Sequence, residues 1–101
     1  MPTLYEYFGI YIYFFSNDHE PIHVHAKCGN RICKAVFIID NGKVIDVKIK
    51  PDGENIPLRS DEIKKVSELL KHYSSDIVNK WMDFFILNKK IKTIKITKRL
   101  K

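Results

Sequence analysis

The residues most able to do chemistry are three histidines that lie close together, His19, His23 and His25. His23 and His25 are two residues apart in an alternating segment, so on a strand both rings point to the same side. His19 precedes them in a polar segment, flanked by Asp18 and Glu20. Imidazole nitrogens bind divalent metal ions, and paired imidazoles exchange protons near neutral pH. The cluster therefore predicts a functional site of one of these two kinds.

A structural interpretation of the cluster competes with these two functional ones. In an acid–base site, His23 and His25 would act on a phosphodiester, and His19 and Asp18 would assist them. In a metal site, the three histidines would bind the ion together with Asp18 or Glu20. In the structural interpretation, the histidines are hydrogen-bonded at the rim of the core. All three stay open, whether the chain is an enzyme is undecided, and we predict no cofactor.

The elements that position these residues follow from the hydrophobic pattern. Residues 8–15, 22–28, 31–39 and 43–50 have the composition or the alternation of β-strands. Gly29-Asn30 favours a type II′ turn between the second and third segments, and Asn41-Gly42 favours a type I′ turn between the third and fourth. The first half of the chain is therefore expected to form an antiparallel strand meander.

Helical spacing replaces the alternation from Ser60 onward. Ser60 is a suitable N-cap, and apolar residues recur at helical spacing in 63–70 and again in 77–86, where Trp81 is expected in the core. Residues 73–76 separate the two stretches, so the sequence predicts two helices. The expected fold class is α+β: one domain over residues 1–101, with about four antiparallel strands covered by two C-terminal helices.

The two hairpin turns also predict which residues lie opposite each other. The first turn places His25 opposite Lys34 and His23 opposite Val36, and the second places Val36 opposite Val47. The histidines would then share a face with Val36 and Val47, and this face would be half-buried under the helices. The same face would carry Ile38, Ile45 and Ile49.

The two cysteines are predicted to be free. Cys28 and Cys33, which lies opposite Ala26, occupy the face away from the histidines. Their C-x4-C spacing matches no common zinc motif. They sit on a diagonal of the hairpin, at roughly 7–8 Å, which is too far for an unstrained disulfide. We therefore expect two reduced, mostly buried thiols.

Positive charge is the main compositional feature, with a formal net charge of +6 and a pI of about 9.3. Such a balance favours anionic partners such as RNA, DNA or an acidic protein. Residues 89–101 contain no acidic side chain and form either an edge strand or a solvated basic tail. The residues of this segment that we expect to contact phosphate are Lys89, Lys90, Lys92, Lys95, Lys98 and Arg99.

The N-terminal sequence predicts a cytoplasmic location. It lacks the basic region and the long aliphatic run of a signal peptide. The apolar stretch 10–15 is too short to span a bilayer. No membrane partner is therefore expected.

Several of these segments together resemble a known family. The pattern Asp18-His19-x-Pro21-x-His23-x-His25-Ala26 is similar to that of the small bacterial proteins of the domain-of-unknown-function family 4160. The similarity extends over about residues 1 to 85. It also includes Met1-Pro2-Thr3, Phe8-Gly9-Ile10-x-Ile12, Val36-Phe37-x-Ile39, Asn41-Gly42 and Asn79-Lys80-Trp81.

The resemblance implies one half of a two-gene module, in the manner of toxin–antitoxin pairs. It implies a small partner protein encoded nearby and an RNA target, and it selects His19, His23 and His25 as the residues to test. Together with the positive charge, it makes a module that binds or cleaves RNA the leading hypothesis. The alternatives are a non-enzymatic partner-binding protein with structural histidines and a metal-binding domain.

Overall fold

The computed structural model describes residues 3–14, 22–87, 93–98 and 100. Within these ranges the chain forms a six-stranded sheet and one helix. The elements are β1 (Thr3–Tyr7), β2 (Ile10–Tyr13), β3 (His23–Cys28), β4 (Arg31–Asp40), β5 (Lys43–Pro51), α1 (Ser60–Phe85) and β6 (Ile94–Ile96). The sheet order is β5-β4-β3-β2-β1-β6, and all neighbours are antiparallel except β1 and β6. The expected α+β class is confirmed.

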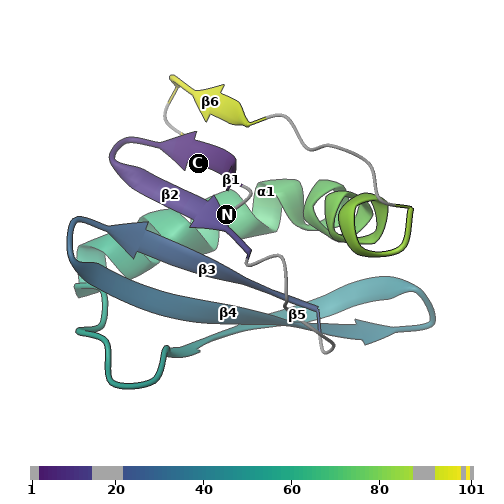
Figure 1. The fold of residues 1–101 in the computed structure, drawn as a ribbon, viewed down its shortest axis with the longest axis horizontal. Coiled ribbons are helices and arrows are strands. Elements are labelled where there is room, and N and C mark those ends of the chain that lie inside the picture. The colour runs from purple at the N-terminus through teal and green to yellow at the C-terminus, as the bar shows by residue number, and fades with distance from the viewer. Residues whose placement is uncertain (1–2, 15–21, 88–92, 99, 101) are drawn as a thin grey trace.

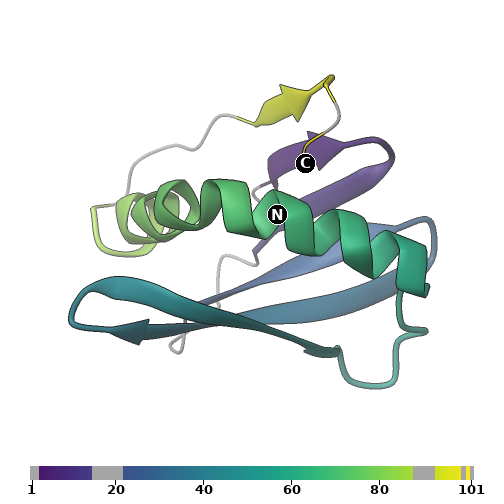
Figure 2. The same cartoon turned by 180° about the vertical axis from the view of Figure 1, so that it is seen from behind.

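The helix covers one face of the sheet. It lies behind the strands in Figure 1 and in front of them in Figure 2, so the fold has two layers. The buried residues that form the core between the layers are Leu4, Tyr5, Tyr7, Ile10, Ile12, Phe14, Val24, Ala26, Cys33, Ala35, Phe37, Leu58, Val66, Leu69, Leu70, Ile77, Trp81 and Ile96. The opposite face of the sheet, which we call the open face, has no helix over it in the described part of the chain.

The prediction of two helices is wrong, because α1 is one kinked helix from Ser60 to Phe85. Its backbone departs from helical geometry at Tyr73, with φ −117° and ψ 16°, at the start of the predicted break. The serines that follow lower helix propensity by only about 0.5 kcal/mol each, and there is no proline or glycine to end the helix. Ile77 and Trp81 are buried in the same core as the first half of α1. This packing keeps the chain helical beyond the kink.

A buried tyrosine holds the second half of α1 against the sheet. The Tyr5 hydroxyl donates a hydrogen bond to the Asp76 carboxylate. The ammonium group of Lys80 lies 4.5 Å from the centroid of the Tyr5 ring and 3.5 Å from the same carboxylate. Burial, followed by the hydrogen bond to Asp76, raises the pKa of Tyr5 far above its ordinary value. Tyr5 is therefore a neutral donor, and it ties β1 to the helix just beyond the kink.

The predicted strand 8–15 is confirmed only over β2 (Ile10–Tyr13), because its first two residues form a hairpin turn. Phe8 and Gly9 form the turn between β1 and β2, with φ +46° and +83°. Positive φ at both central residues is the geometry of a type I′ turn, which bulky residues seldom adopt. The aromatic side chain at the first position hid the turn from sequence reasoning.

The two predicted hairpin turns are present, but a β-bulge changes one predicted register. In the first hairpin, His23 lies opposite Val36 as expected. In the second, the pairing slips by one residue between Ile38 and Ile39, and Val36 lies opposite Lys48 rather than Val47. The bulge inverts β5 relative to the expectation, because a one-residue slip exchanges the two faces of a strand.

Burial explains why the bulged register is preferred. It puts Val47 and Ile49 on the helix-covered face, where both pack against the core, and leaves Lys48 and Lys50 exposed. Full burial of one such aliphatic side chain is worth about 1.5–3 kcal/mol, and the partial burial of Val47 and Ile49 contributes a fraction of that. With β4 oriented as it is, the unbulged register would instead have placed the two lysines beneath the helix, where lysine is almost never found.

The described part of the chain contains no helix that is long and apolar enough to cross a membrane.

Candidate functional site on the open face

The histidine pair lies on the open face of the sheet, and the prediction that it shares the helix-covered face is wrong. His23 and His25 alternate along β3 with Val24 and Ala26, which are buried toward α1. The β-bulge in the second hairpin is the reason, since it moves Val47 away from the histidine face. The expectation that the two rings point to the same side is confirmed, because their centroids are 5.3 Å apart.

His25 is held firmly although it lies on the open face. The Nδ1 atom of its ring is 2.8 Å from the Oδ2 atom of Asp52, and its ring stacks on that of Tyr13, with centroids 5.3 Å apart. Only 5% of His25 is exposed, whereas His23 is half-buried. A carboxylate on one ring nitrogen sets the tautomer and the orientation of an imidazole. Asp52 therefore positions His25, and His23 is the more accessible ring.

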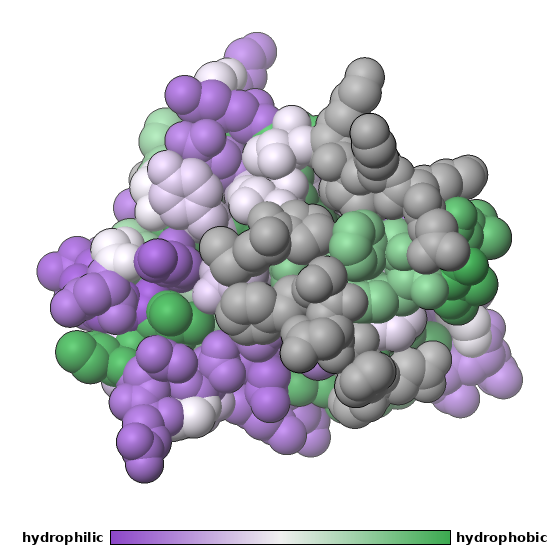
Figure 3. Space-filling view, viewed as in Figure 1, coloured by the Kyte–Doolittle hydropathy of each residue, from purple (hydrophilic) through white to green (hydrophobic). Residues whose placement is uncertain are grey.

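Lysines flank the histidines on the same face. The strand pairing forms one row across four strands, in the order Tyr13, His25, Lys34 and Lys50. In the next row Lys48 lies across β4 from His23. Figure 3 shows this face, on which hydrophilic residues gather over β4 and β5.

Lys34 and Lys50 form a like-charged pair in directly opposite positions of β4 and β5. Opposite residues of antiparallel strands have Cα atoms only about 4.5–5.5 Å apart, and like charges at such positions destabilise a sheet. Within the described residues, neither ammonium group lies within ion-pair distance of a carboxylate. The pair therefore creates a local positive potential that an anion would relieve.

The open face also carries an exposed aromatic side chain. Tyr11 lies opposite Lys27 and Glu6 in the central strands, and 42% of it is exposed. Beyond Glu6, the row ends at Lys95 in β6. The face thus combines basic groups with an aromatic ring, which is the composition of sheets that bind single-stranded nucleic acids.

The remaining predicted site residues fall into two groups. Asp18 and His19, with Glu20, lie outside the described residues, as do Lys89, Lys90, Lys92 and Arg99. In the basic C-terminal segment, Lys95 lies in β6 at the edge of the sheet, and Lys95 and Lys98 are exposed. The described residues contain no group of three histidine, cysteine or acidic side chains that could hold a metal ion.

A second charged cluster lies at the start of α1, and its role is structural. Arg31 donates two hydrogen bonds to the Glu62 carboxylate, and the one from its Nε atom has a length of 2.8 Å. The backbone N–H of Arg59 donates a third. Glu62 is only 3% exposed. The hydrogen bonds from Arg31 hold the pKa of Glu62 well below its usual range. The cluster fastens the first turn of the helix to β4.

The predictions for the cysteines are confirmed. Cys28 and Cys33 are free thiols, Cys33 lies opposite Ala26, and neither residue is on the histidine face. Cys33 is buried and its Sγ atom accepts a hydrogen bond from the Leu58 backbone N–H at 3.3 Å. Burial is the main cause that raises the pKa of the Cys28 thiol. A raised pKa disfavours the reactive thiolate of Cys28. Cys33 belongs to the core, and Cys28 packs against it.

Sequence reasoning missed Asp52, Tyr13 and the Lys34–Lys50 pair as members of the site. The register of the first hairpin already placed Lys34 beside His25, so this residue had a usable signal. Lys50 needed the bulge in β5, and Asp52 follows that strand in a turn-rich segment with no distinguishing pattern. Their contribution depends on pairing across four strands.

The comparisons with known proteins agree with the resemblance described from the sequence. The family model of DUF4160, a domain of unknown function, matches residues 9–82, which include β2 to β5 and most of α1. Comparison with curated proteins and with solved structures found no match.

Proposed function

The chain belongs to the DUF4160 family, and on that premise we propose that it binds RNA on the open face of its sheet. The observation that carries this proposal is the Lys34–Lys50 pair beside His25. A phosphate group between the two ammonium groups would turn a repulsive pair into two favourable contacts. The row from Tyr13 to Lys50 crosses four strands and spans ~14 Å, which is wide enough for more than one phosphate.

The aromatic residues favour RNA over a small anion as the ligand. Tyr11 offers an exposed ring near Lys27, and bases of single strands stack on such rings next to basic side chains. The net charge of +6 adds long-range attraction for a polyanion. We propose that this binding takes place in the cytoplasm.

In this proposal, the histidines of the open face supply the catalytic groups. His23 is the accessible imidazole beside the lysine row, and it is the group that would exchange a proton with a phosphodiester. His25 would support it as a positioning residue, because Asp52 and Tyr13 hold its ring. The assisting roles proposed for His19 and Asp18 rest on the motif alone.

Binding is tested with a fluorescein-labelled single-stranded RNA of ten nucleotides and fluorescence anisotropy at two salt concentrations. The Lys34→Ala/Lys50→Ala variant should bind at least 10-fold more weakly, and its salt slope should fall by about 1.4, since each phosphate contact on a single strand contributes about 0.7. A charge-matched control is Lys64→Ala/Lys71→Ala, which removes two exposed lysines from α1. An equal loss in both variants, or no binding by the wild type, would refute the proposed face.

Cleavage is tested on the same RNA by gel electrophoresis. The His23→Ala variant should keep its RNA affinity within about 3-fold and lose the cleavage activity, as expected for a group that acts on the reacting phosphate. Intact RNA after long incubation with the wild type would remove the catalytic part of the proposal and leave RNA binding alone.

The family resemblance supports a toxin–antitoxin-type role for this RNA-directed activity. Expression of the wild-type chain in a bacterial host without its partner should then inhibit growth, and the His23→Ala and Lys34→Ala/Lys50→Ala variants should not. Inhibition by all three chains at equal expression would contradict this role.

The burial of His25 favours a second candidate function, a non-enzymatic protein whose histidines are structural. In that case the basic face meets an acidic protein and His25 contributes stability. The RNA anisotropy measurement separates the two functions, because a purely partner-binding chain gives no difference between the open-face variant and the α1 control.

A further inference from the structure

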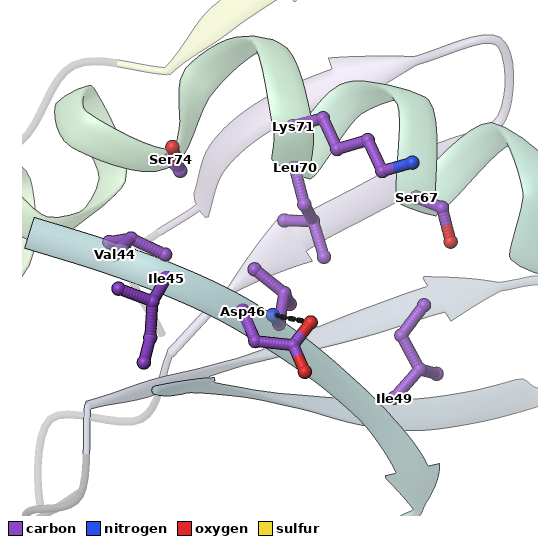
Figure 4. A pocket seen from close by; sticks show the side chains of 9 residues that line it. Val44, Ile45, Asp46, Ile49, Ser67, Leu70, Lys71 and Ser74 are labelled. Carbon is purple, nitrogen blue, oxygen red and sulfur yellow. Dashed lines mark hydrogen bonds between the residues drawn. The ribbon is translucent and has the colours of Figure 1, made fainter. Parts of the chain in front are cut away.

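Strand β5 forms one edge of the sheet, and a groove lies between it and α1. The groove has a volume of about 280 Å³. Figure 4 shows its two walls, with the helix above and the strand below. The lining residues are Ser67, Leu70, Lys71 and Ser74 from α1, and Val44, Ile45, Asp46, Val47 and Ile49 from β5. Ile45, the extra residue at the bulge, is 63% exposed.

The backbone of β5 presents hydrogen-bonding groups to this groove. Phe37 in β4 donates its N–H to the Ile22 carbonyl at 3.0 Å, on the β3 side. Opposite residues of antiparallel strands alternate between hydrogen-bonded and non-bonded pairs, so the Phe37–Val47 pair is a non-bonded one and the Val47 N–H points away from β4. The Asp46 carboxylate accepts that N–H at 2.8 Å, as Figure 4 shows.

A strand added at this edge would meet two different surfaces. Its side chains that point toward α1 would lie beside Val47, Ile49 and Leu70, which are apolar. Its side chains that point toward the open face would lie beside Lys48 and Lys50, which are exposed. Alternation of apolar and acidic residues is the pattern that satisfies both sides.

The charges around the groove select an acidic occupant. Lys71 lines it, Lys43, Lys48 and Lys50 lie along β5, and Asp46 is the acidic residue among those that line it in the described part of the chain. A second copy of β5 would bring its own lysines against these four, and like charges across an interface are unfavourable. Charge complementarity therefore points to a different protein.

We infer that β5 binds an extended, acidic segment of a partner protein as an additional strand, with its apolar side chains in the groove beneath α1. Asp46 has a definite place in this interaction. Its carboxylate occupies the Val47 N–H that the added strand needs, and its charge repels an acidic segment. Asp46 thus protects the free edge until the partner displaces it, since unpaired edges otherwise attract unwanted strands.

The inference is tested with a fluorescein-labelled peptide of nine residues in which glutamate alternates with valine. This length matches that of β5. Binding to the full chain is measured by fluorescence anisotropy, and a peptide with lysine in place of glutamate is the control ligand. The wild type should bind the acidic peptide and not the basic one, because the basic peptide would face the lysines of β5.

Two variants should change the affinity for the acidic peptide in opposite directions. Asp46→Ala should tighten acidic-peptide binding about 3- to 10-fold, because it frees the Val47 N–H and removes the repulsive charge. The charge-matched control Asp61→Ala, an exposed residue in the first turn of α1, should change binding by less than 2-fold. Val47→Pro removes the outward N–H, which β4 does not use, and should weaken binding at least 10-fold.

Each other outcome overturns the inference. The inference is refuted if the wild type does not bind the acidic peptide at about 1 mM, a concentration well above the dissociation constants of ordinary specific partners. Equal binding of the basic peptide would also refute it. Equal effects of Asp46→Ala and Asp61→Ala would also refute it, and this comparison decides alone if Val47→Pro fails to fold. A concentration-dependent dimer in sedimentation experiments that Val47→Pro abolishes would assign the edge to a second copy instead.

Discussion

Replacing the two histidines of β3 one at a time separates a structural role from a functional one. In His25→Ala the chain loses the hydrogen bond to Asp52, which contributes about 1 kcal/mol. It also loses the stack on Tyr13, worth about 0.5–1.5 kcal/mol, and leaves a small cavity, because His25 is 5% exposed. We therefore expect a loss of about 2–3 kcal/mol in the free energy of unfolding.

His23→Ala and His72→Ala should cost much less than His25→Ala. His23 is half-buried, so its replacement should cost within about 1 kcal/mol, and the exposed His72 should cost within about 0.5 kcal/mol. For a domain of this size, 1 kcal/mol corresponds to roughly 4–8 °C in melting temperature. Thermal melts and urea titrations of the three variants at pH 7 make the comparison.

A double-mutant cycle tests the contact that carries most of this argument. If Asp52 and His25 interact as the structure indicates, Asp52→Ala combined with His25→Ala should show a coupling energy of about 1 kcal/mol. A His25→Ala variant that melts within about 3 °C of the wild type, or a cycle with no coupling, would refute the idea that Asp52 positions this ring. His25 would then be a catalytic candidate whose ring Asp52 does not position.

Three further predictions concern stability and thiol chemistry. Because Arg31 holds the folded-state pKa of Glu62 far below its unfolded value of about 4.3, the stability that the carboxylate contributes is complete above that pH and is lost as the pH falls. Glu62→Gln should therefore be destabilised at pH 7, and the gap to the wild type should narrow steadily as the pH falls below about 4.3 in urea titrations; a pH-independent gap would contradict this. Phe8→Asn should raise the free energy of unfolding by about 0.5–1 kcal/mol, since asparagine tolerates φ +46° better, and a lower melting temperature would count against the strain. The Cys28 thiol should be alkylated by iodoacetamide at a rate that still rises above pH 9 in the folded chain, because burial raises its pKa; a plateau near pH 8.5, as in a free thiol, would show that it is exposed.

Local turn chemistry allowed much of the sheet to be predicted. The Asn41-Gly42 turn has φ +51° and +77°, which is the type I′ geometry that this dipeptide favours. The first hairpin has the expected pairing along its whole length, including His25 opposite Lys34. Prediction failed at Phe8-Gly9, where the residue type gave no sign of a turn. For the C-terminal segment the sequence left an edge strand and a basic tail both open, because the pairing of β6 with β1 joins distant parts of the chain.

The sequence predicted which residues of the second half are helical, but not that they form one helix. The apolar spacing on both sides of residues 73–76 identified the buried face, and Trp81 lies in the core as expected. Whether a weak helical segment breaks or only kinks depends on what packs against it. Tyr5 and the core behind it hold the segment beyond Tyr73, and no local pattern encodes that contact.

The sequence by itself determined the α+β class, the shared orientation of His23 and His25, and the family, because these depend on periodicity, turn residues and a local motif. Only the tertiary structure decided which face of the sheet the histidines occupy. That choice depends on a β-bulge one residue long, which is preferred because it buries Val47 and Ile49 beneath α1 and leaves Lys48 and Lys50 exposed. A one-residue slip changes no local preference, so the sum of burial over the whole sheet selects the face that carries the candidate site.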